Sequence, residues 1–220
     1  MKTRHAIPSL GLVAVLLLGP VTIDATGPNS SGFLPAKAKV HGLSLVDIAT
    51  AYTLWGFGTS ADVNPLIASR CERSPIDPNI WFLPVSVGGD AVATCSVPPG
   101  AFLVATPGFI ECSNIEPPPF FGTNLNELKD CVDGWFEQLN YAEVILDGTP
   151  VANLDTYALT ARPVRLPANN LNSADPGVSL SKGYFLVIPP LSRGTHTLRL
   201  YDEFLALGFK AGLTITIVAG

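Results

Sequence analysis

The sequence predicts a mainly β protein: an antiparallel β-sandwich, immunoglobulin-like or jelly-roll-like, with two helices packed at one side. Three observations favour this class. Glycine and proline number 20 each among 220 residues, so turns are frequent and the elements between them are short. Hydrophobic residues make up 47% of the chain, which is enough to build a sizeable core. The expected strands do not alternate regularly with helices, which disfavours a parallel βαβ sheet.

The N-terminus has the layout of a secretory signal peptide. Basic residues precede an uncharged apolar run at 10–18, which is shorter than the about 20 residues that span a bilayer. Ala25 offers a small residue for cleavage, so we expect residues 1–25 to be removed. The mature protein is then expected to be secreted, periplasmic or at the cell surface, with no membrane span. Residues 26–43 lack periodicity and predict a flexible leader before a single domain at 44–220.

The first half of the domain mixes helices and strands. Ser44 and Asp47 form a capping box that opens a helix, and Gly56 and Gly58 end it. A second helix is expected over 124–139, where apolar residues keep helical spacing. Strands are expected at 80–87 and 91–97, joined as a hairpin by the turn 88–90, and at 101–106 with a continuation over 108–112.

The second half reads as strands. The strand 141–146 ends at Asp147-Gly148, the strongest short hairpin signal in the chain. Apolar and β-branched runs separated by turn residues predict four further strands. These lie at 157–166, 184–188, 195–201 and 207–218.

The four cysteines fit an exported protein. They are Cys71, Cys95, Cys112 and Cys131, an even number that an oxidising compartment allows to pair. No two have C-x-x-C spacing, so neither a zinc ribbon nor a redox pair is indicated. Three connectivities are possible. We favour the sequential pairing, Cys71–Cys95 and Cys112–Cys131, in which each bond closes a loop of about 20 to 25 residues and contributes roughly 3 kcal/mol.

A set of short motifs extends along most of the mature chain, over roughly residues 50–201. They are Asn64-Pro65, Cys71, Trp81-Phe82-Leu83, Cys95 to Gly100, Glu111-Cys112, Leu128 to Cys131 and Gly183 to Thr197. Together these motifs resemble a family of uncharacterised secreted bacterial proteins. That family has no assigned activity, so the resemblance supplies no catalytic residues. The chain departs from the family at Ala101, where lysine is usual, and before Cys112, where asparagine is frequent.

Charge and motif content exclude several function classes. The net charge is −5 and no basic stripe is present, so nucleic acid is not an expected partner. Residues 56–61 match G-x-G-x-x-A, but they follow a helix instead of a strand, and we expect no cofactor. One histidine, His196, lies in the sequence expected to be ordered, and no calcium-loop motif occurs. We therefore expect no metal site.

His196 is the one candidate general base. It shares a strand face with Leu198 and Leu200, which predicts a rim or buried histidine bonded to backbone. The alternative is a base that works with Asp202 or Glu203, although no G-x-S-x-G elbow supplies a serine. These two acids are also candidates for a glycosidase-type carboxylate pair.

A second acid pair and one aromatic pair complete the candidates. Glu111 and Glu116 are the other possible glycosidase-type carboxylates, with solvated surface acids as the alternative. Phe120 and Phe121, in a proline-rich loop, are candidate ligand-binding residues because exposed aromatics grip partners. Their alternative role is to fold back and cover the core.

These features predict a secreted, non-enzymatic β-sandwich module with a binding or structural role outside the cytoplasm. Its expected partner is an extracellular protein or a glycan. One alternative is a secreted hydrolase that uses His196 with a carboxylate. Another is a carbohydrate-binding module, which requires at least two coplanar exposed aromatic rings. The sequence carries no signal for an oligomeric state.

Overall fold

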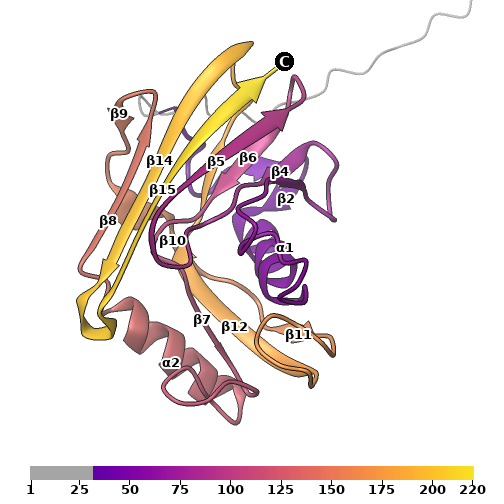
Figure 1. Ribbon diagram of the computed structural model, residues 1–220, viewed down its shortest axis with the longest axis vertical. Helices are drawn as coiled ribbons and strands as arrows, with labels where there is room; N and C mark the ends of the chain where they lie inside the picture. The colour runs from indigo at the N-terminus through magenta and orange to yellow at the C-terminus, as the bar shows by residue number, and fades with distance from the viewer. Residues whose placement is uncertain (1–31) are drawn as a thin grey trace, which may run out of the picture.

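The computed structural model describes residues 32–220, and over this range the chain is mainly β with two α-helices, as the sequence predicts. The expected signal peptide, residues 1–25, lies outside the described residues. Two sheets of the chain pack face to face as a sandwich. A third sheet lies below them in Figure 1, with a helix on each side. None of the helices in the described range is long and apolar enough to span a membrane.

The largest sheet is five-stranded and forms one side of the sandwich. Its order is β5 (Gly89–Val97), β15 (Phe209–Ala219), β14 (Gly194–Phe204), β8 (Tyr141–Leu146) and β9 (Thr149–Pro150). The pairs β14–β15, β14–β8 and β8–β9 are antiparallel, whereas β5 lies parallel to β15. The long β14–β15 hairpin extends below the rest of the sheet and is closed by the 3-10 turn η2 (Leu205–Leu207) (Figure 1).

A four-stranded sheet packs against the inner face of the first. Its order is β13 (Leu186–Ile188), β6 (Phe102–Ala105), β4 (Ile80–Phe82) and β3 (Glu72–Arg73). Alternate residues of both sheets point inward, as strand geometry requires, and together they make the sandwich core. Core members from the two sheets include Leu103, Ala105, Leu186, Ile188, Leu198, Leu200, Leu213, Ile215 and Ile217.

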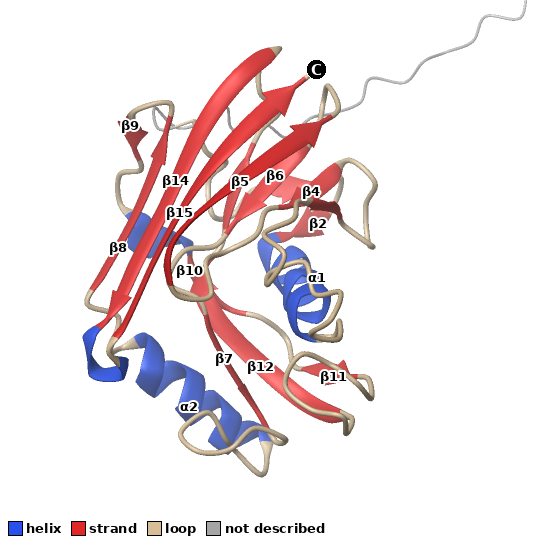
Figure 2. Cartoon of the chain, viewed as in Figure 1, coloured by secondary structure: helices blue, strands red, loops and turns tan. Residues whose placement is uncertain are grey.

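The third sheet lies between the two helices. β12 (Gly177–Tyr184) pairs with β7 (Ile110–Ser113), β10 (Ala158–Thr160) and β11 (Val164–Leu166), all antiparallel. One face of β12 and β7 packs on α2, and α1 lies on the opposite side (Figure 2). That opposite face carries Ser181, whose hydroxyl lies 2.5 Å from that of Thr53 in α1. The short 3-10 turn η1 (Leu154–Tyr157) leads into β10, and the two-residue strands β1 (Lys39–Val40) and β2 (Leu43–Ser44) precede α1.

Both helices begin where the sequence predicts. α1 (Leu45–Phe57) opens with the capping box: the Asp47 carboxylate accepts from the Ser44 backbone at 2.9 Å, and Ser44 Oγ accepts from the Asp47 backbone at 3.3 Å. α2 (Leu125–Phe136) is capped by the Asn124 side chain. It ends three residues earlier than expected.

The flexible leader predicted for 26–43 does not hold from residue 33 onward. Phe33 is fully buried in the sandwich core, and Val40 packs against the α1 core. The Leu34 amide also donates to the Val187 carbonyl at 2.8 Å. The apolar side chains in this segment bind it to the domain, which the absence of periodicity did not indicate.

The hairpin predicted between 80–87 and 91–97 is wrong. β4 and β5 belong to different sheets: β4 pairs in parallel with β6 and antiparallel with β3, whereas β5 pairs in parallel with β15. Pro84 lacks an N–H and ends the first strand after Phe82, so the chain leaves its sheet before the turn. The sandwich is therefore mainly, but not entirely, antiparallel.

Both expected disulfides are present. Cys71 and Cys95 have Cα atoms 5.6 Å apart and join the segment before β3 to β5. Cys112 and Cys131 have Cα atoms 6.3 Å apart and join β7 to α2. The sequential pairing is confirmed, and bonds of this kind are typical of an oxidising compartment.

Candidate functional site

A pocket of ≈ 280 Å³ lies where the tip of the β14–β15 hairpin meets β7 and the C-terminal end of α1. Five of its nine lining residues are phenylalanines, and two are glutamates. We call it the phenylalanine pocket. Its lining is Phe57, Phe109, Ile110, Glu111, Glu116, Phe120, Phe204, Leu207 and Phe209.

The rings of the phenylalanine pocket are held by other aromatic side chains. Phe57 stacks on Phe109 with centroids 5.6 Å apart, and Phe204 lies 6.3 Å from Phe209. Phe120 packs on Trp135 of α2 at 5.5 Å, and the Trp135 indole donates to a backbone carbonyl of the same loop at 3.1 Å. These contacts lie within the chain, so the pocket is largely pre-formed by its own side chains.

Glu111 is the buried polar group of the pocket. It is 6% exposed, and its neighbours in the strand, Ile110 and Cys112, are buried apolar residues. Its carboxyl accepts from the hydroxyl of Ser179 and, at 3.0 Å, from the side-chain amide of Asn172. Side chains alternate along β7, so Glu111 lies on the face opposite the one that packs on α2.

Glu116 lies beside Glu111. It belongs to the loop after β7, where Ser113 Oγ donates to its Oε2 at 2.9 Å, and its carboxyl is within hydrogen-bonding reach of Glu111. Burial raises the pKa of Glu111 well above its usual range, and the adjacent Glu116 carboxyl raises it further. The donors Ser179 and Asn172 oppose this shift without cancelling it. Glu111 therefore keeps its proton at pH values where an ordinary glutamate is ionised.

The structure thus brings together the acid pair Glu111 and Glu116 that the sequence analysis singled out. Hydrogen-bonding contact is closer than the about 5 to 9.5 Å by which glycosidase carboxyls are separated to admit a sugar or a water. Two carboxyls this close favour sharing one proton, because ionising both would place like charges side by side. This geometry does not favour glycoside hydrolysis.

The other acid pair, Asp202 and Glu203, is not brought together. Asp202 lies on the inner face of β14, where burial raises its pKa to about 6. A hydrogen bond from the Gly108 amide acts in the opposite direction and lowers this pKa, but burial has the larger effect. Glu203 lies on the opposite face, where it accepts from Tyr201 at 2.5 Å and pairs with Lys210 at 3.1 Å. Adjacent residues of a strand point to opposite faces, so these carboxyls cannot act on one bond.

His196 shares its strand face with Leu198 and Leu200, as predicted, and its side chain is 13% exposed. Its carboxylate partner is Asp147, in the turn between β8 and β9, with Nδ1 2.6 Å from Oδ2. The expected partners Asp202 and Glu203 lie roughly 20 Å further along the strand, at about 3.3 Å per residue. A base that works with either of them is therefore excluded.

Ser192 completes a serine–histidine–aspartate series that the sequence reasoning missed. Its Oγ lies 3.4 Å from His196 Nε2, but its backbone carbonyl lies closer, at 3.0 Å. A carbonyl only accepts, so Nε2 carries a proton and donates to it, while Nδ1 donates to Asp147. With both ring nitrogens donating, His196 has no lone pair to take a proton from the serine. The hydrogen bond to Asp147 and the Ser192 carbonyl raise the pKa of His196, consistent with a charged ring.

The two predicted ligand-binding aromatics have different environments. Phe120 is half-buried and lines the phenylalanine pocket, whereas Phe121 is 39% exposed at the surface beside it. The rings of exposed Tyr141 and half-buried Tyr201 have centroids 5.9 Å apart but are tilted by 59°, so they do not offer the coplanar rings of a carbohydrate platform.

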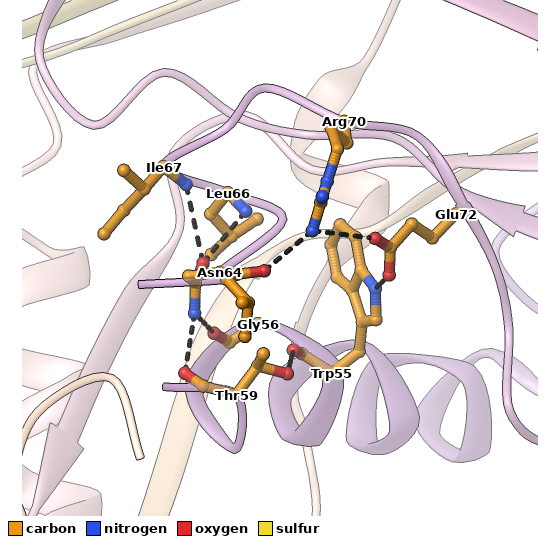
Figure 3. A network of polar contacts seen from close by, with 9 residues as sticks. Trp55, Gly56, Thr59, Asn64, Leu66, Ile67, Arg70 and Glu72 are labelled. Carbon is orange, nitrogen blue, oxygen red and sulfur yellow. Dashed lines mark hydrogen bonds and ion pairs between the residues drawn. The ribbon is translucent and has the colours of Figure 1, made fainter. Parts of the chain in front are cut away.

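The G-x-G-x-x-A segment at 56–61 is a structural loop at the end of α1 (Figure 3). Asn64 is 1% exposed and donates to the carbonyls of Gly56 at 2.7 Å and Thr59 at 2.9 Å, while its Oδ1 accepts from the Leu66 amide. A Cβ on Gly56 would lie 2.9 Å from Leu66, so close packing accounts for this glycine. The polar groups of Asn64 and of the carbonyls that it contacts are therefore bonded to one another within the loop.

Comparisons with protein-family models, curated proteins and solved structures find no match for the chain. Over residues 32–220, no group of three or more histidine, cysteine or acidic side chains is placed to hold a metal ion. The chemistry available in the pocket is that of aromatic rings and two carboxyls.

Proposed function

We propose that the chain is a secreted, non-enzymatic binding module that takes a small, largely apolar ligand into the phenylalanine pocket. The observation that carries the proposal is a pre-formed aromatic pocket with one buried carboxyl at its wall. Ligand sites combine an apolar lining with a few convergent polar groups and a perturbed pKa, and Glu111 supplies both. A volume of ≈ 280 Å³ suits a ligand of about one ring.

The lining also narrows the partner class. A glycan presents many hydroxyls, each of which requires a polar partner when buried. The phenylalanine pocket supplies two carboxyls among apolar side chains, which favours a small molecule over the glycan or extracellular protein expected from the sequence.

Secretion belongs to the same proposal. The N-terminal pattern of basic residues, apolar run and small residue supports it, and so do the disulfides Cys71–Cys95 and Cys112–Cys131. Membership in the family of secreted bacterial proteins that the motifs resemble is proposed with it. N-terminal sequencing of protein exported by the native host tests cleavage near residue 25, and an intact Met1 on that protein would contradict it.

A binding role is favoured over hydrolysis by the state of the candidate groups. His196 donates from both nitrogens, and Glu111 and Glu116 are in mutual contact. Neither arrangement leaves a free base positioned beside a nucleophile. The contact of both His196 ring nitrogens with acceptors disfavours hydrolysis by His196 with the Asp147 carboxylate.

Titration with 2-phenylethanol, a neutral single-ring probe, tests the binding proposal by NMR. We expect saturable shifts of pocket resonances with a Kd in the micromolar to millimolar range, given the small size of the probe. Leu207→Trp fills the pocket and is expected to weaken binding about 10-fold or more. Leu205→Trp is the matched control, because Leu205 lies in the same turn, is 55% exposed and does not line the pocket. Absence of saturable binding, or equal binding by the two variants, would overturn the proposal.

A further inference from the structure

The ligand class can be narrowed by the charge of the phenylalanine pocket. Of its nine lining residues, Glu111 and Glu116 are the charged ones, and no cationic side chain lines it. Neither acid takes part in the ion pairs found among residues 32–220. When the two carboxyls share one proton, the pocket holds one net negative charge without a counter-ion from the described chain.

Resting on the proposed function, we propose that the ligand is an organic amine: an ammonium group on an apolar body of about one ring, with the ammonium replacing the proton shared by Glu111 and Glu116. The exchange is balanced in atoms and charge. The protonated amine enters as a cation, the shared proton leaves to solvent, and both carboxylates then face the ammonium. No covalent bond of the ligand changes.

The carboxyls retain the acceptor capacity that this arrangement needs. A carboxylate offers about four lone-pair sites. Glu111 uses two for Ser179 and Asn172, and Glu116 uses one for Ser113. An ammonium carries three N–H donors, so the remaining sites are sufficient to bind it.

The rest of the lining suits the same ligand. Phenylalanine faces carry negative electrostatic potential and attract cations placed within about 6 Å of the ring centre. The same rings bury the apolar body of the amine. An anion of equal size would meet the negative charge of the acids and would gain nothing from the ring faces.

Three probes on one scaffold test this inference: 2-phenylethylammonium, 2-phenylethanol and phenylacetate. By calorimetry or NMR at neutral pH, we expect the cation to bind at least about 10-fold more tightly than the alcohol, and the anion more weakly than either. Glu116→Gln is expected to collapse the cation-to-alcohol ratio toward one. Glu111→Gln provides a second such variant, and Glu137→Gln, which removes an exposed acid at the end of α2, is expected to keep the wild-type ratio.

Proton release is the second readout. The groups that face Glu111 are Ser179 from β12, Asn172 from the loop before β12, and the Glu116 carboxyl. Calorimetry in two buffers of different ionisation enthalpy is expected to show up to one proton released per amine bound, and none for the alcohol.

The outcomes separate the two proposals. If the alcohol binds but the amine binds no more tightly, or binds without proton release, the amine inference is overturned and the binding pocket stands. If none of the three probes binds saturably, the pocket proposal itself falls. If the amine preference survives in both glutamine variants, the acids are not its cause and the inference is again overturned.

Discussion

Replacing His196 with alanine is expected to destabilise the protein by about 2 kcal/mol, because this side chain ties β14 to the turn between β8 and β9. That turn is Asp147-Gly148, with both residues at positive φ of 49° and 77°, as a tight hairpin requires. Asp147 accepts from His196 at 2.6 Å and from the Thr197 amide at 2.8 Å. The imidazole therefore connects three strands through one carboxylate.

The magnitude follows from exposure. The His196 side chain is 13% exposed, but that of Asp147 is 46% exposed, so solvent screens the ion pair and its contribution is about 1 kcal/mol. Loss of the hydrogen bond to the Ser192 carbonyl and of the packed ring adds roughly 1 kcal/mol more. Asp147→Asn keeps the turn geometry and is expected to remove only the ion-pair share.

The pH dependence has a definite sign. The hydrogen bond to Asp147 raises the pKa of His196 above its ordinary value of 6.5, so this stabilisation is complete below pH 6.5 and is lost as pH rises through the raised pKa. For Asp147, burial acts to raise the pKa, but hydrogen bonds from His196 and Thr197 lower it below 3.8. Its stabilisation is complete above pH 3.8 and is lost in stronger acid. The pair thus contributes fully between about pH 4 and 6.5.

Urea denaturation of the wild type, His196→Ala, Asp147→Asn and the double variant measures the coupling. We expect about 1 kcal/mol of coupling at pH 5.5 and less at pH 9. An NMR titration of the His196 ring is expected to give a pKa above 6.5. An unchanged stability in His196→Ala, together with a ring that titrates at or below 6.5, would refute the reasoning. The imidazole would then be a free base, and a hydrolase substrate screen would be the next experiment.

Three further predictions concern stability. Replacing Cys112 and Cys131 with alanine is expected to cost about 3 kcal/mol in denaturant titrations, since the bond closes a loop of about 20 residues. Asn64→Ala is expected to cost about 3 kcal/mol, because the carbonyls of Gly56 and Thr59 lose their buried donor; a thermal melt within 1 °C of the wild type would contradict this. Burial raises the pKa of Glu111, so stability is expected to fall as pH rises through that pKa. In urea titrations from pH 5 to 9, Glu111→Gln should reduce this fall to the share that His196 contributes, and a decline of equal size in both proteins would count against the prediction.

Elements with a local signal could be predicted from the sequence. The capping box at Ser44 and the N-cap at Asn124 fix the helix starts through contacts within three residues. The Asp147-Gly148 turn likewise sets its own hairpin. The disulfide pairing could be predicted because each bond joins cysteines that are consecutive in the sequence.

Elements that depend on partners distant in the sequence could not be predicted from it. The parallel pairing of β5 with β15 joins residues more than a hundred positions apart, and no short motif specifies it. β12 was expected only from Tyr184 onward, because serine, glycine and lysine interrupt its pattern. Those polar residues are compatible with a central strand because helices cover both faces and supply partners: Ser181 meets Thr53 of α1, and Lys182 pairs with Asp133 of α2 at 2.7 Å.

The pocket shows the same division. From the sequence, Glu111 and Glu116 could be named as a candidate carboxylate pair, and Phe120 as a candidate binding aromatic in a proline-rich loop. The partners of Glu111 could not, because Asn172 and Ser179 lie 61 and 68 residues away. The rings that close the pocket, Phe204 and Phe209, come from a hairpin tip whose position relative to β7 only the tertiary structure defines.

The position of Glu111 is the strongest physical argument that the pocket serves a ligand. A carboxyl that is 6% exposed and faces a second carboxyl costs folding free energy that an apolar residue in the same strand would not. Its bonds to Ser179 and Asn172 order the neighbouring loop, but a glutamine at this position would keep an acceptor for them and would carry no charge. The ionisable group is therefore surplus to the structural role. If Glu111→Gln were more stable at pH 8 yet lost its amine preference, stability and binding would be opposed at this residue, which is the relation expected of a functional site.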